Sequence, residues 1–231
     1  MRSIHIFPFY KIHLIFIDYI CRYNTKIIQN LLSPTTRLQI MIDKHLVNDI
    51  KHISFSLFNK NFFSVYHGSI SARIGSSTFI INSRDSILDD INEESLIKLD
   101  CQKRDYRWSL ASTDAHIHEL IYKTIPNAKY VSYSMPPYAT AFSLKHGKVS
   151  PQDYYGRKVL GDVIVYDPKN IEDWIDRAPH EINQFFKKFE THLLLVKGFG
   201  VICYDRDITE MAKKISILEN SCRILALSTT L

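Results

Sequence analysis

The sequence lacks the run of about 18 apolar residues that a membrane-spanning helix needs. Its most apolar stretch, IHIFPFYKIHLIFIDYI, is interrupted by Pro8, Lys11, His13 and Asp18. The next residues, CRYNTKIIQN, offer no small-residue cleavage site of the kind that ends a secretory signal. We therefore expect neither a transmembrane segment nor a secretory signal.

Cysteine pairs at metal-binding spacing are also absent. Cys21, Cys101, Cys203 and Cys222 lie far apart, and none belongs to a C-x-x-C motif. Neither a zinc knuckle nor a disulfide framework is encoded. Isolated thiols are typical of a reducing compartment, so the predicted location is cytoplasmic. The sequence also contains no P-loop, no dinucleotide-binding glycine motif and no Ser-His-Asp order.

Long runs of one charge are missing too. The chain carries 29 basic and 24 acidic residues, and its densest basic clusters, FFKKFE and MAKKIS, hold only pairs of lysines. Interspersed charge of this kind is typical of a solvated surface rather than of a phosphate-binding face, despite the net charge of +5. We expect no nucleic-acid partner.

The chain has enough apolar residues for one core, because 45% of its 231 residues are hydrophobic. From Met41 onwards, apolar residues recur at helical spacing, at Ile42, Leu46, Ile50, Ile53 and Leu57. We predict one domain over residues 41–231, preceded by an extension over residues 1–40 that packs poorly. The extension is either an arm that docks on a partner or a membrane surface, or the result of a start assigned too early, with Met41 as the true start. We favour the second interpretation.

Hairpins and helices are mixed along the domain. Alternating apolar residues in HGSISARI, a GSS turn and the returning TFIIN predict a hairpin. Further strands are predicted in LIKLD, AKYVSYS, DVIVYDP and on both sides of the glycines in HLLLVKGFGVICYD. Helices are predicted in STDAHIHELIYKTI, after Pro136-Pro137, in NIEDWIDRAPHEINQFFKKF and in the amphipathic segment from Ile208. This mixture indicates an α+β or layered α/β class.

Three fragments in this order carry a family resemblance: HGSISAR, ASTDAHIHELIY, and YSMPPYATA followed by KGFGVICYDRDITEMAKKISILENSCRIL. Over roughly residues 41–228 they resemble the class II aldolase/adducin domain family, which includes fuculose-phosphate aldolases, ribulose-phosphate 4-epimerases and the head domain of adducin. Each motif alone is weak, but their order across the domain is specific. The resemblance implies an α/β fold of three layers, α/β/α, with a central, mostly antiparallel sheet. It also implies a homo-oligomer, with the tetramer as the family's form.

The resemblance also implies where a site would lie. Gly68, Ser71 and Arg73 match the family's first loop, in which Ser69 replaces an asparagine, and His67 precedes this loop and could reach the pocket. Asp114 matches the catalytic carboxylate, in the first turn of a helix that Ser112 or Thr113 is expected to cap. His118 matches a histidine that is not a metal ligand, and we expect a backbone carbonyl to satisfy it.

The three zinc-binding histidines of the family are replaced by Tyr133, Met135 and Phe199. Zinc needs nitrogen, thiolate or carboxylate donors. A thioether prefers softer metals, a phenol with a pKa of about 10 is mostly protonated at neutral pH, and a phenyl ring offers no donor. His116 and His118 cannot replace them together, because residues two apart on a helix point about 200° from each other. We therefore expect no metal and no cofactor.

The phosphate-binding side of the family's site is also altered. The segment NSRDS puts Asp85 near an expected glycine, where a carboxylate would repel phosphate, although Arg84 and Arg73 could compensate. Lys197 is the only lysine near the inferred pocket, and a Schiff base there would need no metal. A lysine before a tight turn is more often simply solvated.

The function we predict is that of a zinc-less, catalytically degenerate family member that binds a protein or a small ligand. The alternative is an active aldolase or epimerase acting on a sugar phosphate with relocated metal ligands, for which zinc would be the cofactor. We expect Tyr133, Met135, Phe199 and Asp114 to converge on one pocket. An ionised Asp114 would need a donor there, for which the Tyr133 hydroxyl is the natural candidate, or its pKa should rise.

Overall fold

The computed structural model describes residues 43–65 and 67–229, so the prediction made for residues 1–40 lies outside the described residues. The described part contains an eight-stranded sheet in the order β3-β2-β1-β4-β8-β7-β6-β5. The strands are β1 Ser69–Arg73, β2 Thr78–Asn82, β3 Leu96–Asp100, β4 Tyr130–Ser134, β5 Lys148–Val149, β6 Val163–Tyr166, β7 Leu193–Val196 and β8 Gly200–Asp205. All neighbouring pairs are antiparallel except β6 and β7.

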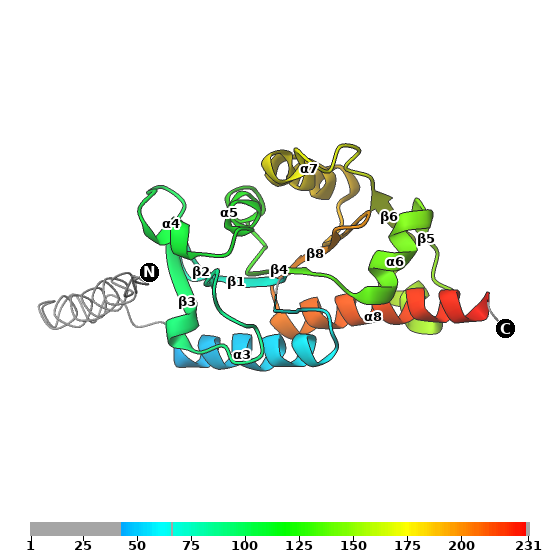
Figure 1. Ribbon diagram of the computed structural model, residues 1–231, viewed down its shortest axis with the longest axis horizontal. Helices are drawn as coiled ribbons and strands as arrows, with labels where there is room; N and C mark the ends of the chain where they lie inside the picture. Colours follow the sequence, from blue (N-terminus) through cyan, green and yellow to red (C-terminus); the bar gives the residue numbers. More distant parts are fainter. Residues whose placement is uncertain (1–42, 66, 230–231) are drawn as a thin grey trace, which may run out of the picture. The chain divides into compact units, whose positions relative to one another are not determined.

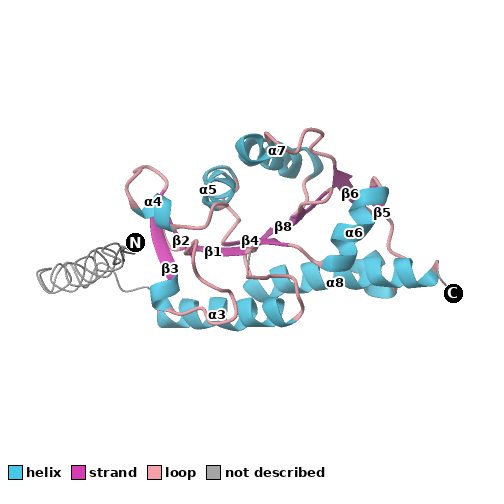
Figure 2. Ribbon diagram, viewed as in Figure 1, coloured by secondary structure: helices cyan, strands magenta, loops and turns pink. Residues whose placement is uncertain are grey.

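Helices cover both faces of the sheet (Figure 1). On one face lie α5 (Ala115–Thr124) and α7 (Trp174–Phe189), which pack against each other. On the other face lie α3 (Lys44–Asn59), α6 (Pro137–Lys145) and α8 (Ile208–Ser228). Figure 2 shows the strands between these two helical layers. The predicted three-layer α/β/α fold with a mostly antiparallel sheet is confirmed.

Shorter segments complete the described part. The 3-10 helix η1 (Glu93–Ser95) directly precedes β3, and the helix α4 (Arg107–Leu110) follows β3. The segment η2 (Gly156–Leu160) is π-helical. The sequence pattern did not predict α4, β5 or η2, because each is too short to show a period. None of the helices within residues 43–65 and 67–229 is both long and apolar enough to cross a membrane.

The predicted hairpin is the β1–β2 pair, in which Ser71 faces Ile81 across the ladder. The predicted cap of α5 is wrong in detail. Asp114 occupies the cap position and its side chain makes no capping hydrogen bond. The Ser112 hydroxyl instead accepts from the amide of Asp114 at 3.3 Å, so it forms a local turn before the helix begins.

The start of α6, directly after Pro136-Pro137, is stabilised from another helix. Both oxygens of the Glu219 carboxylate, on α8, accept backbone N–H groups there, from Tyr138 at 3.0 Å and from Ala139 at 2.8 Å. These N–H groups have no partner within their own helix. Glu219 is only 8% exposed, so it connects α6 to α8 inside the protein.

We expect the replacement Glu219→Ala to lower the free energy of unfolding by about 2–3 kcal/mol, because two buried N–H groups lose a charged acceptor. Urea unfolding followed by circular dichroism measures this loss. The control is Glu210→Ala on the same helix, whose pair with Lys213 is exposed and should contribute little to stability. Equal losses in the two variants would contradict a capping role for Glu219.

Candidate functional site

A cavity of about 320 Å³ lies where loops from both halves of the sheet meet the starts of α5 and α7. Its walls contain five of the residues predicted for the site, namely His67, Gly68, Asp114, Tyr133 and Phe199. The other wall residues are Ser64, Val65, Asn82, Arg84, Ser86, Leu88, Ser112, Thr113 and Ile175. Asn82 ends β2, and its side-chain oxygen accepts the amide of Ile70 at 2.9 Å.

The turn between β7 and β8 places Phe199 over Tyr133 at the end of β4. Gly198 and Gly200 adopt φ angles of +69° and +130°, which favour glycine. A Cβ atom at Gly200 would also lie 2.4 Å from the carbonyl oxygen of Ser134. The two strands can therefore approach closely only with glycine at this position.

The rings of Tyr133 and Phe199 are stacked, with centroids 4.4 Å apart and an interplanar angle of 22°. The Tyr133 hydroxyl donates to the carbonyl oxygen of Phe199 at 2.8 Å. Trp174 packs edge-on against Phe199, with centroids 5.8 Å apart. At two positions where the resemblance implies metal ligands, the structure has aromatic rings that bind each other.

The residues present do not fit a zinc ion. Phe199 offers no donor atom, and the Tyr133 hydroxyl is engaged with a backbone carbonyl while burial raises its pKa further. Across residues 43–65 and 67–229, no group of three or more His, Cys, Asp or Glu side chains is arranged to hold a metal ion. Zinc sites in proteins use at least three such ligands.

Three residues predicted for the site do not line the cavity. Met135 follows the last residue of β4, and its amide donates to the carbonyl of Phe62 at 2.7 Å, outside the sheet ladder. The two-residue alternation that pairs it with Tyr133 therefore does not extend to Met135. Ser69 and Ser71 are fully buried beneath α5, where both bind His118.

Asp114 is the buried acid of the cavity, and its main chain begins α5. Burial raises its pKa, and hydrogen bonds from the hydroxyls of Ser69 and Ser112 offset only part of this effect. The expectation that Tyr133 donates to Asp114 is wrong, because its hydroxyl binds Phe199. The other expected outcome, a raised pKa, is the one that the structure favours.

His118 is fully buried, and its partners differ from the expected backbone carbonyl. Ser69 Oγ lies 2.9 Å from Nε2, and Ser71 Oγ lies 2.6 Å from Nδ1. Burial lowers the pKa of His118 to about 3, so the ring is neutral. Ser69 and Ser71 are two residues apart on one strand, so they point to the same face. This spacing could have predicted that both serines face α5. His116 is exposed and stacks on Trp108.

The charged groups near the cavity differ from the expectation. Arg84 lines the cavity, whereas Asp85 does not. Arg73 donates to the carbonyl oxygens of Tyr122 and Ile125 at the end of α5, so its role is structural. Lys197 pairs with Asp167 at 3.1 Å and is not a wall residue, which argues against a Schiff-base lysine at this site.

His67 brings a polar atom without a partner to the cavity wall. Its Nδ1 lies 2.8 Å from the Ser64 hydroxyl. Its Nε2 is buried and has no hydrogen-bond partner among the described residues. Burial lowers the pKa of His67, which favours the neutral ring. A polar atom of a ligand could satisfy this nitrogen.

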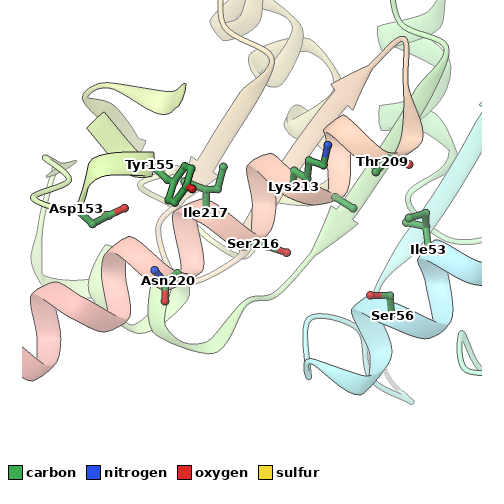
Figure 3. A pocket seen from close by; sticks show the side chains of 10 residues that line it. Ile53, Ser56, Asp153, Tyr155, Thr209, Lys213, Ser216, Ile217 and Asn220 are labelled. Carbon is green, nitrogen blue, oxygen red and sulfur yellow. The ribbon is translucent and has the colours of Figure 1, made fainter. Parts of the chain in front are cut away.

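A second cavity, of about 380 Å³, lies between α3, α8 and the segment before η2 (Figure 3). Its charged wall residues are Asp153 and Lys213, and both have structural partners. Asp153 accepts from the amide of Gly156 and the hydroxyl of Ser221, and Lys213 pairs with Glu210. The cavity at Asp114 is therefore the better candidate for a polar ligand.

The pH dependence of stability should reveal the buried Asp114. Its folded-state pKa lies above the ordinary value of 3.8, so the folded protein holds this proton more tightly than the unfolded chain. The resulting stability is fully present below pH 3.8 and is lost as the pH rises through the folded pKa. We expect wild type to lose stability relative to Asp114→Asn over this window, measured by urea unfolding at several pH values.

The control for this test is Asp153→Asn. Burial raises the pKa of Asp153, but hydrogen bonds from Ser221 and Gly156 outweigh burial and lower it. The sign is therefore reversed, and wild type should lose stability relative to Asp153→Asn as the pH falls. A pH-independent difference between wild type and Asp114→Asn would show that Asp114 is not perturbed.

Comparisons with known proteins agree with the observed fold. Residues 48–226 match the model of the Class II Aldolase and Adducin N-terminal domain. No curated protein sequence matches the chain. The L-fuculose-1-phosphate aldolase of Thermus thermophilus is similar in structure, with a TM-score of 0.71, 21% identity and coverage of 80% of this chain and 94% of that one.

A second similar structure is YgbL of Klebsiella pneumoniae, described as a putative aldolase/epimerase/decarboxylase. Its TM-score is 0.69 at 19% identity, over 81% of this chain and 91% of that one. YgbL of Escherichia coli gives a TM-score of 0.64 at 18% identity, over 79% of this chain and 89% of that one. At these identities the structures show a shared fold, and the family match covers most of the chain. The chain belongs to the class II aldolase and adducin N-terminal domain family.

Proposed function

We propose that this chain is a zinc-less, catalytically degenerate member of its family that binds a small polar ligand in the cavity at Asp114. The observation that carries the proposal is the contact between Tyr133 and Phe199. The resemblance implies metal ligands at both positions. Here the two rings stack on each other, and the Tyr133 hydroxyl binds the backbone carbonyl of Phe199. A metal-dependent cleavage would need free donor atoms at those positions, and neither a phenyl ring nor the engaged Tyr133 hydroxyl supplies one.

The chemistry of the walls supports an anionic ligand that also carries hydroxyl groups. Arg84 supplies a positive charge, and the raised pKa of Asp114 reduces the opposing negative charge. Ser86 and Thr113 offer hydroxyls, and the Nε2 atom of His67 lacks a partner among the described residues. Small anions are commonly recognised by such a combination of one arginine and several neutral polar groups.

The competing function is an active aldolase or epimerase with relocated metal ligands. It is favoured by one observation, the buried carboxyl of Asp114 in a cavity wall. Buried carboxyls with raised pKa values often act as general acids or bases. On that hypothesis Asp114 would exchange a proton with the substrate, and donors outside the described set would have to bind the metal.

A titration with L-fuculose 1-phosphate, the ligand named for the Thermus thermophilus relative, separates the two functions. We expect saturable binding by calorimetry, less than stoichiometric zinc in the purified protein, and no cleavage of the ligand. Replacement Arg84→Gln should weaken binding about tenfold or more, because a charge-assisted hydrogen bond contributes about 1.5–3 kcal/mol. The control Arg223→Gln removes an exposed arginine that lies outside the cavity.

Two results would overturn this proposal. One is zinc bound at one equivalent per chain together with cleavage of the sugar phosphate, which would establish the enzyme. The other is equal binding by wild type and Arg84→Gln, which would show that the ligand lies elsewhere.

We also propose that the chain forms a homo-oligomer, with four subunits suggested by the resemblance, and that it is cytoplasmic. Exposed apolar side chains on α6 and α8, namely Tyr138, Leu144 and Ile224, support an interface there. Cys203 and Cys222 are buried free thiols, in keeping with a reducing compartment. Sedimentation at micromolar concentration should show a species larger than the 26.9 kDa chain. A monomer alone would contradict the assembly.

A further inference from the structure

Asp114 lies at the cavity end of a buried hydrogen-bond chain that runs from Ser69 beneath α5. The Ser69 hydroxyl acts on the Asp114 carboxyl group as a hydrogen-bond donor that lowers its pKa, and Ser69 Oγ lies 2.9 Å from Nε2 of His118. On the other side of the ring, Nδ1 lies 2.6 Å from Ser71 Oγ, which lies 2.7 Å from the Tyr122 hydroxyl. The chain crosses the interface between α5 and β1, which Figure 1 shows as neighbours.

The ring of His118 can occupy this chain in either of two tautomers. A neutral imidazole carries one hydrogen, so one nitrogen donates and the other accepts. Both partners of His118 are serine hydroxyls, and each hydroxyl can donate or accept. The heavy-atom positions therefore fit both tautomers, and the direction of the chain must be set at one of its ends.

We propose that the proton on Asp114 sets the tautomer of His118. An ionised Asp114 can only accept, so the Ser69 hydroxyl donates to it and Ser69 Oγ accepts from Nε2–H. The bare Nδ1 then accepts from Ser71, and Ser71 accepts from Tyr122. A protonated Asp114 reverses every step, because it donates to Ser69, Ser69 donates to Nε2, and Nδ1–H donates to Ser71.

The far end of the chain permits this reversal. When Ser71 donates to Tyr122, the Tyr122 hydroxyl needs another acceptor, and the carbonyl oxygen of Lys129 lies 3.4 Å away. Both serines and Tyr122 carry one hydroxyl hydrogen in each state, and His118 carries one ring hydrogen in each. The two states therefore differ by the single proton that Asp114 releases to solvent or to a ligand. Within the ring, the Nδ1–H bond is exchanged for an Nε2–H bond.

Few other titratable groups could set the direction instead. The groups that line the cavity with Asp114 are His67, Arg84 and Tyr133. The groups near Tyr122 are Arg73, Tyr130 and Cys101. On α5 itself, His116 and Glu119 belong to a separate cluster with Arg104. His67 is the histidine of the cavity wall, so it needs a control.

The inference deepens the proposed function, on whose cavity it rests, by making His118 a positioning residue that acts through Ser69. An anionic ligand would favour the protonated, neutral Asp114, whose hydrogen is donated to Ser69, and hence the Nδ1–H tautomer. A cationic ligand would stabilise the ionised carboxylate and hence the Nε2–H tautomer. The cavity would thereby adapt its charge to that of the ligand without moving the backbone.

The test is nitrogen-15 NMR of the histidine rings, together with carbon-13 NMR of the Asp114 carboxyl, in the full chain without ligand. At every pH between about 4 and 9 a protonated Asp114 should coincide with Nδ1–H, and an ionised Asp114 with Nε2–H. In Asp114→Asn the tautomer should not depend on pH. In the control His67→Gln the pairing should persist.

Any mismatch between the state of Asp114 and the tautomer of His118 would overturn the proposal. A tautomer switch that survives in Asp114→Asn, or one that disappears in His67→Gln, would also overturn it. Because the test uses no ligand, a failure of the relay is distinguishable from a failure of ligand binding.

Discussion

The candidate site depends on the contact that ties the turn between β7 and β8 to the end of β4. The stacked rings of Tyr133 and Phe199 and the hydrogen bond from the Tyr133 hydroxyl to the Phe199 carbonyl form this contact. It brings one wall of the cavity, from the middle of the sheet, towards Asp114 at the start of α5. Both side chains line the cavity, so their contact closes it on that side.

Burial of Asp114 follows from this closure. The carboxyl lies among serine hydroxyls and aromatic rings, and the nearest positive charge in the cavity wall is Arg84, an exposed side chain. With hydroxyl donors alone, the ionised form is poorly compensated, so the pKa rises. The same scarcity of charge keeps His118 neutral, because a second ion would be equally poorly compensated beneath the helix.

Local patterns were sufficient to predict most of the helices and strands, because hairpins and amphipathic helices such as the β1–β2 pair and α8 are encoded by neighbouring residues. The three-layer arrangement of these elements was predicted from the family resemblance. The partnership between Tyr133 and Phe199 could be placed only through the family resemblance. Met135 shows the limit of that approach, since strand alternation stops where the strand does. Arg84 and Asp85 are adjacent, yet only Arg84 lines the cavity, so a shift of one residue reverses the charge that a ligand meets. Sequence spacing determines which residues share a strand face, but tertiary packing decides what that face meets.

The contact between Tyr133 and Phe199 explains how the end of β4 and the turn between β7 and β8 can be joined without an ion. The resemblance implies that a metal would join the end of β4 to the turn between β7 and β8. An aromatic pair at this place contributes about 0.5–1.5 kcal/mol to stability beyond the effect of its buried area. The hydrogen bond to Phe199 adds about 0.5–1.5 kcal/mol. A structural zinc ion contributes far more, about 10 kcal/mol or above, but it also requires several polar ligands to be held in fixed positions. The aromatic contact needs no such ligands, so on the proposed function the strand and the turn stay joined beside a cavity that binds a polar molecule.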